Sequence, residues 1–93
     1  MRQSSPDDSR WEEFAAELGR NLQRARIRAG LSQEHVAYSA GLSRYTYQKY
    51  EKGQSRPGTA ANPSLRALLA IAQSLGEDLS GLLPEKLPDL RAR

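Results

Sequence analysis

The chain has 93 residues, enough for one small domain with a modest core and too few for a separate catalytic domain. It contains no cysteine, which excludes disulfide bonds and cysteine-ligated zinc as supports of the fold. No apolar run approaches the roughly 18 residues of a membrane-spanning helix, and the first ten residues lack the apolar stretch of a signal peptide. We therefore expect a cytoplasmic protein without membrane contact.

The net charge of +3 is concentrated in the middle of the sequence. Residues 20–56 carry eight basic and two acidic side chains, whereas residues 1–19 carry two basic and five acidic ones and residues 57–93 carry four of each. Concentrated positive charge is expected of a protein that binds a polyanion. A charge cluster alone is more often a solvated helix surface, so the polyanion interpretation needs a motif beside it.

The chain begins with an arm and a long helix. Residues 1–8 show no periodicity and are predicted to form a flexible arm. A capping box of Ser9 and Glu12 predicts that the first helix begins at Ser9. Apolar residues then recur at helical spacing as far as Ala29, and Gly30 supplies the left-handed residue that ends the helix.

Two short helices follow, separated by a tight turn. Ser32 caps the first of them, which ends before Gly41, and Ser43 caps the second. That second helix runs to about Lys52 and ends at Gly53. Gly41 can adopt the positive φ that a tight turn requires. The spacing therefore predicts a helix-turn-helix.

The last third of the chain is predicted to contain a loop, two helices and a tail. Residues 54–62 are rich in Pro, Gly and small polar types, which is typical of a loop. A fourth helix begins at Asn62 or Ser64 and runs to Gly76, and a short fifth helix ends before Pro84. Residues 84–93 are predicted to be a frayed tail, so the folded domain spans 9–83. The fold class is all-α, a compact five-helix bundle.

The helix predicted at 43–52 has two different faces. Apolar residues stand where the two short helices must face a core, namely at Val36, Leu42, Tyr47 and Tyr50. The small Ala37 lets these helices cross closely. The opposite face carries Arg44, Tyr45, Gln48, Lys49 and Lys52. These types suit a DNA major groove, because Arg and Lys read guanine, Gln reads adenine and an aromatic ring can contact the thymine methyl group.

The stretch from Leu18 to Leu83 resembles the Cro/repressor type of helix-turn-helix, the Xre-like family of phage and bacterial regulators. The match is carried by Arg26, by GLSQEHVA at 30–37, by AGLSRYTYQKYEKG at 40–53 and by PSLRALLAIAQSLG at 63–76. The resemblance implies a lambda-repressor-like bundle whose third helix, 43–52, enters the major groove of double-stranded DNA.

The resemblance also implies site residues. The family's base-reading positions correspond to Ser43, Arg44, Tyr45, Gln48 and Lys49. Contacts to DNA phosphates are expected from Gln33, Lys52 and Arg56, and Gln33 would also brace the reading helix. A helix N-terminus, where Gln33 lies, suits a phosphate.

Arg26 and Glu51 match the family's ion pair between the first and third helices, and we expect this pair to be buried. The chain departs from the family in two ways. Tyr47 and Tyr50 replace branched aliphatic residues, so their hydroxyl groups must find partners. The loop 53–63 is several residues longer than the family minimum, which makes the position of Arg56 less defined.

These residues predict a sequence-specific transcription regulator, specifically a repressor that occupies an operator. The alternative is an antitoxin or protein-binding adaptor on the same fold. An enzyme is not expected, because no hydroxyl group has a base and an orienting acid laid out beside it. The one histidine, His35, has no partners at metal-ligand spacing, so neither a metal nor a cofactor is expected.

One reading helix covers only a few base pairs. We therefore expect a homodimer on an inverted-repeat operator, with half-sites about 34 Å apart. Apolar residues near the C-terminus exceed what a short last helix needs. They predict a dimer surface at the fifth helix that involves Leu82, Leu83 or Leu87.

Overall fold

The computed structural model of the chain describes residues 6–92. Its elements are α1 (Pro6–Ala29), α2 (Gln33–Ser39), α3 (Arg44–Lys52), β1 (Gln54–Arg56), β2 (Thr59–Ala60), α4 (Leu65–Leu75) and α5 (Leu79–Leu82). The expected helical bundle with α2 and α3 as the helix-turn-helix is confirmed, with one small hairpin added. Across 6–92, no helix has both the length and the apolar character that a membrane span requires.

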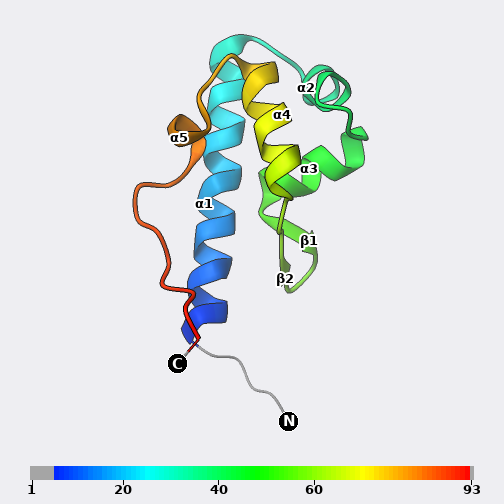
Figure 1. Cartoon of the computed structure of the whole chain (residues 1–93). Helices are drawn as coiled ribbons and strands as arrows, with labels where there is room; N and C mark the ends of the chain where they lie inside the picture. Colours follow the sequence, from blue (N-terminus) through cyan, green and yellow to red (C-terminus); the bar gives the residue numbers. More distant parts are fainter. Residues whose placement is uncertain (1–5, 93) are drawn as a thin grey trace.

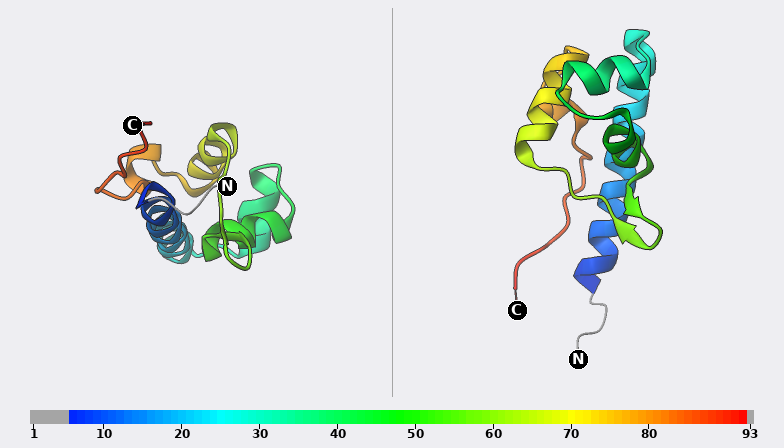
Figure 2. Two further views of the ribbon diagram at one scale, coloured as in Figure 1. Left: turned by 90° about the horizontal axis from the view of Figure 1, so that it is seen from below. Right: turned by 90° about the vertical axis from the view of Figure 1, so that its right-hand side faces the viewer.

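Helix α1 forms the long axis of the molecule, and the other elements pack along its sides (Figure 1). Helices α2, α3 and α4 lie on one side, and α5 with the C-terminal segment lies on the other, an arrangement that Figure 2 shows from two more directions. The core lies between these layers and consists of Leu18, Leu22, Ala25, Val36, Ala37, Tyr47, Ile71, Ala72, Leu75 and Leu82.

Serine caps begin three of the helices. The hydroxyl oxygens of Ser32, Ser43 and Ser64 each accept a hydrogen bond, 3.0 Å long, from the backbone N–H three residues later. Of the two starts considered for the fourth helix, Ser64 is therefore the cap. Gly41 has a φ of +75° in the turn between α2 and α3, as its position predicted.

The start of the first helix was predicted wrongly. Helix α1 begins at Pro6, so Ser9 lies inside it and does not cap it, and residues 6–8 belong to the helix. Proline is favoured in a first helical turn, where its missing N–H has no intrahelical partner to lose. The remainder of the predicted arm, residues 1–5, lies outside the described residues.

The segment predicted as a loop contains an antiparallel hairpin. Gln54 pairs with Ala60 and Arg56 pairs with Thr59, with an irregularity between the two pairs. The turn is Pro57-Gly58, and Gly58 has a φ of +81°. Proline followed by a glycine of positive φ is typical of a type II turn. Strands of three and two residues are too short to show alternation in a sequence.

Helix α5 is tied to α1, and the segment predicted as a frayed tail follows it with most of its described residues exposed. The Asn21 amide donates a 2.8 Å hydrogen bond to the Leu82 carbonyl oxygen, and Pro84 is buried. From there the chain runs back along α1 (Figure 1). Leu82 is only 1% exposed and belongs to the core, so it cannot form a dimer surface as predicted. Leu82 completes the core of this small domain instead, whereas Leu87 and Leu90 are exposed.

Candidate nucleic-acid interface

Helix α3 is held with one face against α1 and α2. Ala37 is fully buried where α2 meets this region, and its carbonyl oxygen accepts a 2.8 Å hydrogen bond from the Leu42 N–H. Tyr47 is fully buried in the core, and Tyr50 packs against its edge. The residues of α3 that face the core therefore fix the direction in which its other face points.

A polar network locks α3 to α1 and α2. Arg26 donates two hydrogen bonds to the Glu51 carboxylate, of 2.6 Å from Nε and 3.2 Å from Nη2. A third Arg26 nitrogen donates to the Leu31 carbonyl oxygen at 3.1 Å, and the Gln33 amide donates to Glu51 Oε1 at 2.9 Å. The Glu51 side chain is 4% exposed and that of Arg26 is 14% exposed. The structure thus contains a largely buried ion pair between the two residues that the resemblance implied.

The network also sets the charge of its members. Burial works to raise the pKa of Glu51, but the hydrogen bonds, that of Arg26 foremost, outweigh burial and hold the pKa below its ordinary value. The hydrogen bond with Glu51 raises the pKa of Arg26 despite the cost of burial. Both groups are therefore charged at neutral pH, and their pairing is an ionic one.

The Tyr47 hydroxyl group does not find the partner that was expected for it. It is buried and forms no hydrogen bond with the described residues. Burial, and then the neighbouring Glu51 carboxylate, raise the pKa of Tyr47 well above its usual range. Tyr47 is fully buried in the core cluster and stabilises it through its ring.

The other face of α3 points away from the core. Ser43, Arg44 and Tyr45 are exposed, whereas Gln48 and Lys49 are partly exposed. The Ser43 hydroxyl is already engaged with Thr46, since it caps the helix and donates to the Thr46 hydroxyl at 3.0 Å. The predicted base-reading residues therefore lie together on one helix, with different freedom to contact a ligand.

Tyr45 and Lys49 are in contact with each other. The Lys49 Nζ lies 4.2 Å from the centre of the Tyr45 ring, a cation–π arrangement between residues one helical turn apart. Tyr45 is nevertheless 67% exposed. The sequence placed both residues on this face, but their spacing alone did not identify the pair.

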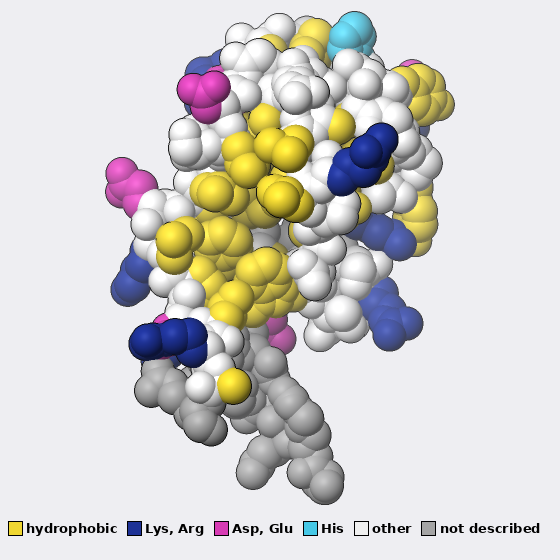
Figure 3. Space-filling model, in the orientation of Figure 1, with side chains coloured by type: hydrophobic (Ala, Val, Ile, Leu, Met, Phe, Trp, Pro, Cys, Tyr) yellow, Lys and Arg dark blue, Asp and Glu magenta, His cyan; other side chains and the backbone are white. Residues whose placement is uncertain are grey.

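The three residues predicted to contact phosphates occupy three different elements. Gln33 opens α2 and uses its side-chain N–H on Glu51. Lys52 is exposed at the end of α3, and Arg56 is exposed on the hairpin. Figure 3 shows Lys and Arg side chains over α3 and the hairpin along one edge of the molecule. Lys52 thus ends α3 and Arg56 ends the first strand of the hairpin, whereas the Gln33 side chain turns toward Glu51.

Two glycines that the sequence analysis did not single out for packing let α3 approach α1. A Cβ atom at Gly19 would lie 2.7 Å from the Tyr50 carbonyl oxygen, and one at Gly53 would lie 2.7 Å from the Ala16 Cα. Both distances are too short for a real Cβ atom. Glycine inside a predicted helix, where it lowers stability, was the signal that could have identified Gly19.

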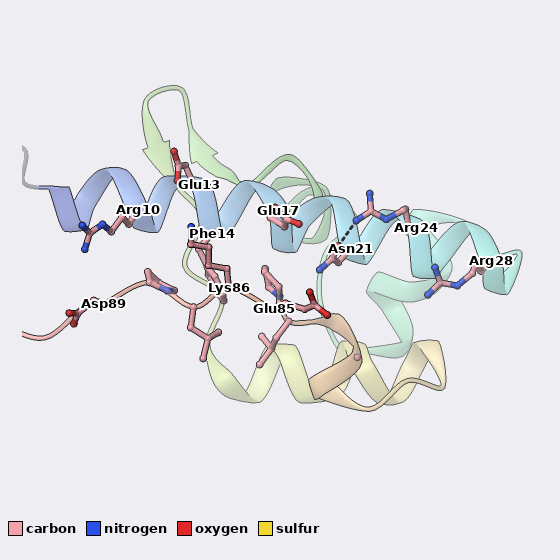
Figure 4. Close-up of a pocket in the computed structure, with 15 residues that line it drawn as sticks. Arg10, Glu13, Phe14, Glu17, Asn21, Arg24, Arg28, Glu85, Lys86 and Asp89 are labelled. Atoms are coloured by element: carbon pink, nitrogen blue, oxygen red, sulfur yellow. Dashed lines mark hydrogen bonds between the residues drawn. The ribbon is translucent and has the colours of Figure 1, made fainter.

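A recess lies on the side of α1 that faces away from α3. It is a groove of about 820 Å³ between α1 and the C-terminal segment (Figure 4), lined by basic and acidic residues in similar number. Arg28, at one end of it, lies 3.5 Å from Glu77. Within 6–92, no three His, Cys, Asp or Glu side chains are grouped as metal ligands, and His35 is exposed.

Comparison with known proteins places this arrangement in a family. The model of the helix-turn-helix domain matches residues 17–82. The chain is similar to the restriction-modification controller protein C.AhdI from Aeromonas hydrophila, with 32% identity and a TM-score of 0.66 over 74% of this chain and 96% of that one. It is also similar to the hypothetical transcription factor NHTF from Neisseria, with 25% identity and a TM-score of 0.60 over 95% and 87%. No curated protein matches the chain.

The family match spans the elements that carry the candidate interface. Residues 17–82 include α2, α3, the turn between them and the network that braces α3. The family consists of regulators that bind DNA and is not enzymatic. The chain therefore belongs to the helix-turn-helix domain family of DNA-binding transcription regulators, in its Cro/repressor type.

Proposed function

We propose that this protein is a sequence-specific repressor that occupies an operator in double-stranded DNA, with 43–52 in the major groove. The observation that supports this most is the contrast between the two faces of α3. One face is fixed by the core and the Glu51 network, and the other presents polar and charged side chains to solvent. Such a protein works where its operator lies, in the cytoplasm.

Base reading is assigned to the exposed face. The Arg44 side chain has no hydrogen bond or ion pair with any residue in the described part of the chain and is free to make a bidentate contact to guanine. Gln48 is one turn further along the same helix and can pair with adenine. Tyr45, with Lys49 against its ring, offers a surface for a thymine methyl group. Ser43, already committed to the helix cap, contributes at the helix start.

Contacts to the DNA backbone are assigned to residues around the exposed face of α3. Lys52 ends α3 and Arg56 lies on the hairpin that follows it, and both are exposed. Gln33 braces α3 through Glu51 and has a second amide hydrogen available for a phosphate. Contacts to phosphates fix the position of a protein on DNA without reading its sequence.

A homodimer on an inverted repeat remains part of the proposal, with a revised surface. Leu83 is partly buried beside the core, and Leu87 is 66% exposed. Leu65 and Leu69 on α4 add further exposed apolar area, and Figure 3 shows apolar side chains gathered over α4 and the region beside it. Two subunits would place two reading helices about 34 Å apart on one side of the duplex.

The second candidate is an antitoxin or adaptor that uses this fold to bind a protein. The exposed leucines on α4 favour it, because a contiguous apolar surface often marks a protein contact. The exposed face of α3 favours DNA, since a protein partner bound there would have to neutralise the charges of Arg44 and Lys49. An adaptor would bind its partner without selecting any duplex.

Selection of bound duplexes from random DNA tests the proposal. We expect enrichment of one site with two-fold symmetry, bound by two chains per duplex. Enrichment of a site without symmetry, bound by one chain, would contradict the proposed dimer. Absence of any enriched site would contradict sequence-specific binding and favour the adaptor function.

A further inference from the structure

The hairpin that follows α3 is anchored firmly at its base. The Ala61 N–H donates a 2.9 Å hydrogen bond to the Gly53 carbonyl oxygen, which closes the hairpin where it leaves the domain. Gly53 is buried against the backbone of α1, where a Cβ would lie 2.7 Å from the Ala16 Cα, and Ala61 is only 2% exposed. The hairpin is therefore a fixed projection rather than a loose loop.

The tip of this projection is exposed and free of negative charge. Arg56, Pro57, Gly58 and Thr59 are all exposed. No acidic residue occurs between Lys52 and Arg66 in the sequence. The Arg56 side chain forms no hydrogen bond or ion pair with another residue of the described segment. An unpaired positive charge on a rigid tip that carries no other charged side chain is suited to an anionic ligand in a narrow site.

The hairpin also has a defined place relative to the reading helix. It continues directly from the C-terminal end of α3 and extends downward from that helix in the view of Figure 1, apart from α4 (Figures 1 and 2). When α3 lies in a major groove, the next features of the duplex beyond its end are one phosphate strand and then the adjacent minor groove. A strand of three residues extends about 10 Å, whereas the minor groove is about 6 Å wide.

We infer that the hairpin crosses the phosphate strand and places Arg56 in the minor groove that flanks the half-site, in place of the phosphate contact assigned to Arg56 above. The inference rests on the proposed function, because it takes α3 as the major-groove helix. Arginine is attracted to narrow A·T-rich minor grooves, where the negative potential is strongest. The 2-amino group of guanine projects into the minor groove and obstructs such an insertion. The operator is therefore read in two grooves, by α3 and by Arg56.

Three duplexes that differ only at the flanking base pairs test this. One carries A·T, one G·C and one inosine·C, which resembles G·C in the major groove but lacks the 2-amino group in the minor groove. We expect the A·T and inosine·C duplexes to bind alike and about fivefold or more tightly than G·C. Equal binding of all three would overturn the inference and leave Arg56 as a phosphate contact. Equal binding of inosine·C and G·C, both weaker than A·T, would overturn it in favour of major-groove reading.

Variants assign the effect to Arg56. We expect Arg56→Ala to bring the three duplexes within about twofold of one another, whereas Arg24→Ala, which removes the same charge from the opposite side of α1, should keep the wild-type ratio. An unchanged ratio in Arg56→Ala would overturn the inference. If wild-type protein still prefers the selected core site over a scrambled one, only the minor-groove contact has failed. If that preference is also absent, the proposed function has failed with it.

Discussion

The two faces of α3 differ in what their side chains are committed to. On the inner face Glu51 is 4% exposed and holds hydrogen bonds from two other helices, and Tyr47 is fully buried. On the outer face Arg44 is exposed without a partner in the described chain, and Tyr45 is 67% exposed. Within this one helix of nine residues, the inner face therefore fixes the position of the helix, and the outer face is available to contact a ligand. Substitutions on the two faces should therefore change different measured quantities.

The largest effect is expected from Glu51→Ala. This change leaves Arg26 buried and unpaired, and breaking one side of a buried pair costs about 3–5 kcal/mol. The melting temperature should fall sharply in thermal unfolding followed by circular dichroism. Glu34→Ala, which removes an exposed carboxylate from α2, is the control and should stay within about 0.5 kcal/mol of wild type. A Glu51→Ala protein as stable as the control would mean that the network does not hold α3.

A smaller effect is expected from Gly19→Ala. The added Cβ would lie 2.7 Å from the Tyr50 carbonyl oxygen, a backbone atom that cannot move without shifting α3. Overpacking of this kind costs about 1–3 kcal/mol, against the gain of roughly 0.5–1 kcal/mol that alanine gives in a helix. Urea unfolding measures the difference. Gly81→Ala is the matched control, since its Cβ would meet only the flexible end of Glu77 at 3.3 Å. Stabilisation by Gly19→Ala would show that α1 and α3 are not in close contact.

The pH dependence of stability gives a further and smaller test of the inner face. The pKa of Glu51 is lowered in the folded protein, so its contribution is fully present above the unfolded value, about 4.5, and is lost as the pH falls through the folded value. Wild type should therefore lose more stability between pH 6 and acid pH than Glu51→Gln, whose side chain does not titrate. Urea unfolding across this range measures both. Parallel curves for the two proteins would contradict an ionised Glu51.

Much of this frame was predictable from local sequence. Ser32 and Ser43 mark helix starts because a serine hydroxyl accepts from the exposed N–H groups of a first turn. Gly41 marks the turn because its φ is positive. Arg26 and Glu51 are 25 residues apart. Their pairing was therefore predicted only by the resemblance to a family and not by local sequence. Their base-reading and phosphate-binding neighbours stay predictions.

Other features depend on contacts that a local pattern does not encode. The hairpin was missed because its strands are too short for periodicity, although Pro57-Gly58 marks its turn. Leu82 was assigned to a surface because the sequence does not show how many residues the core needs, and it is 1% exposed. Gln33 was expected both to brace the reading helix and to contact a phosphate. Its amide donates to Glu51, a partner that only the fold brings within reach, and its phosphate contact stays a prediction.

The outer face of α3 is tested most directly by the affinity of Arg44→Ala for the selected site and for a scrambled duplex, measured across a salt series. We expect a loss of about 1–3 kcal/mol on the selected site with relaxed choice at one base pair. The scrambled duplex should lose little, because nonspecific binding depends on phosphate contacts. Arg24→Ala controls for the change in net charge. An equal loss on both duplexes would show that Arg44 grips the backbone, and the assignment of base reading to α3 would be contradicted.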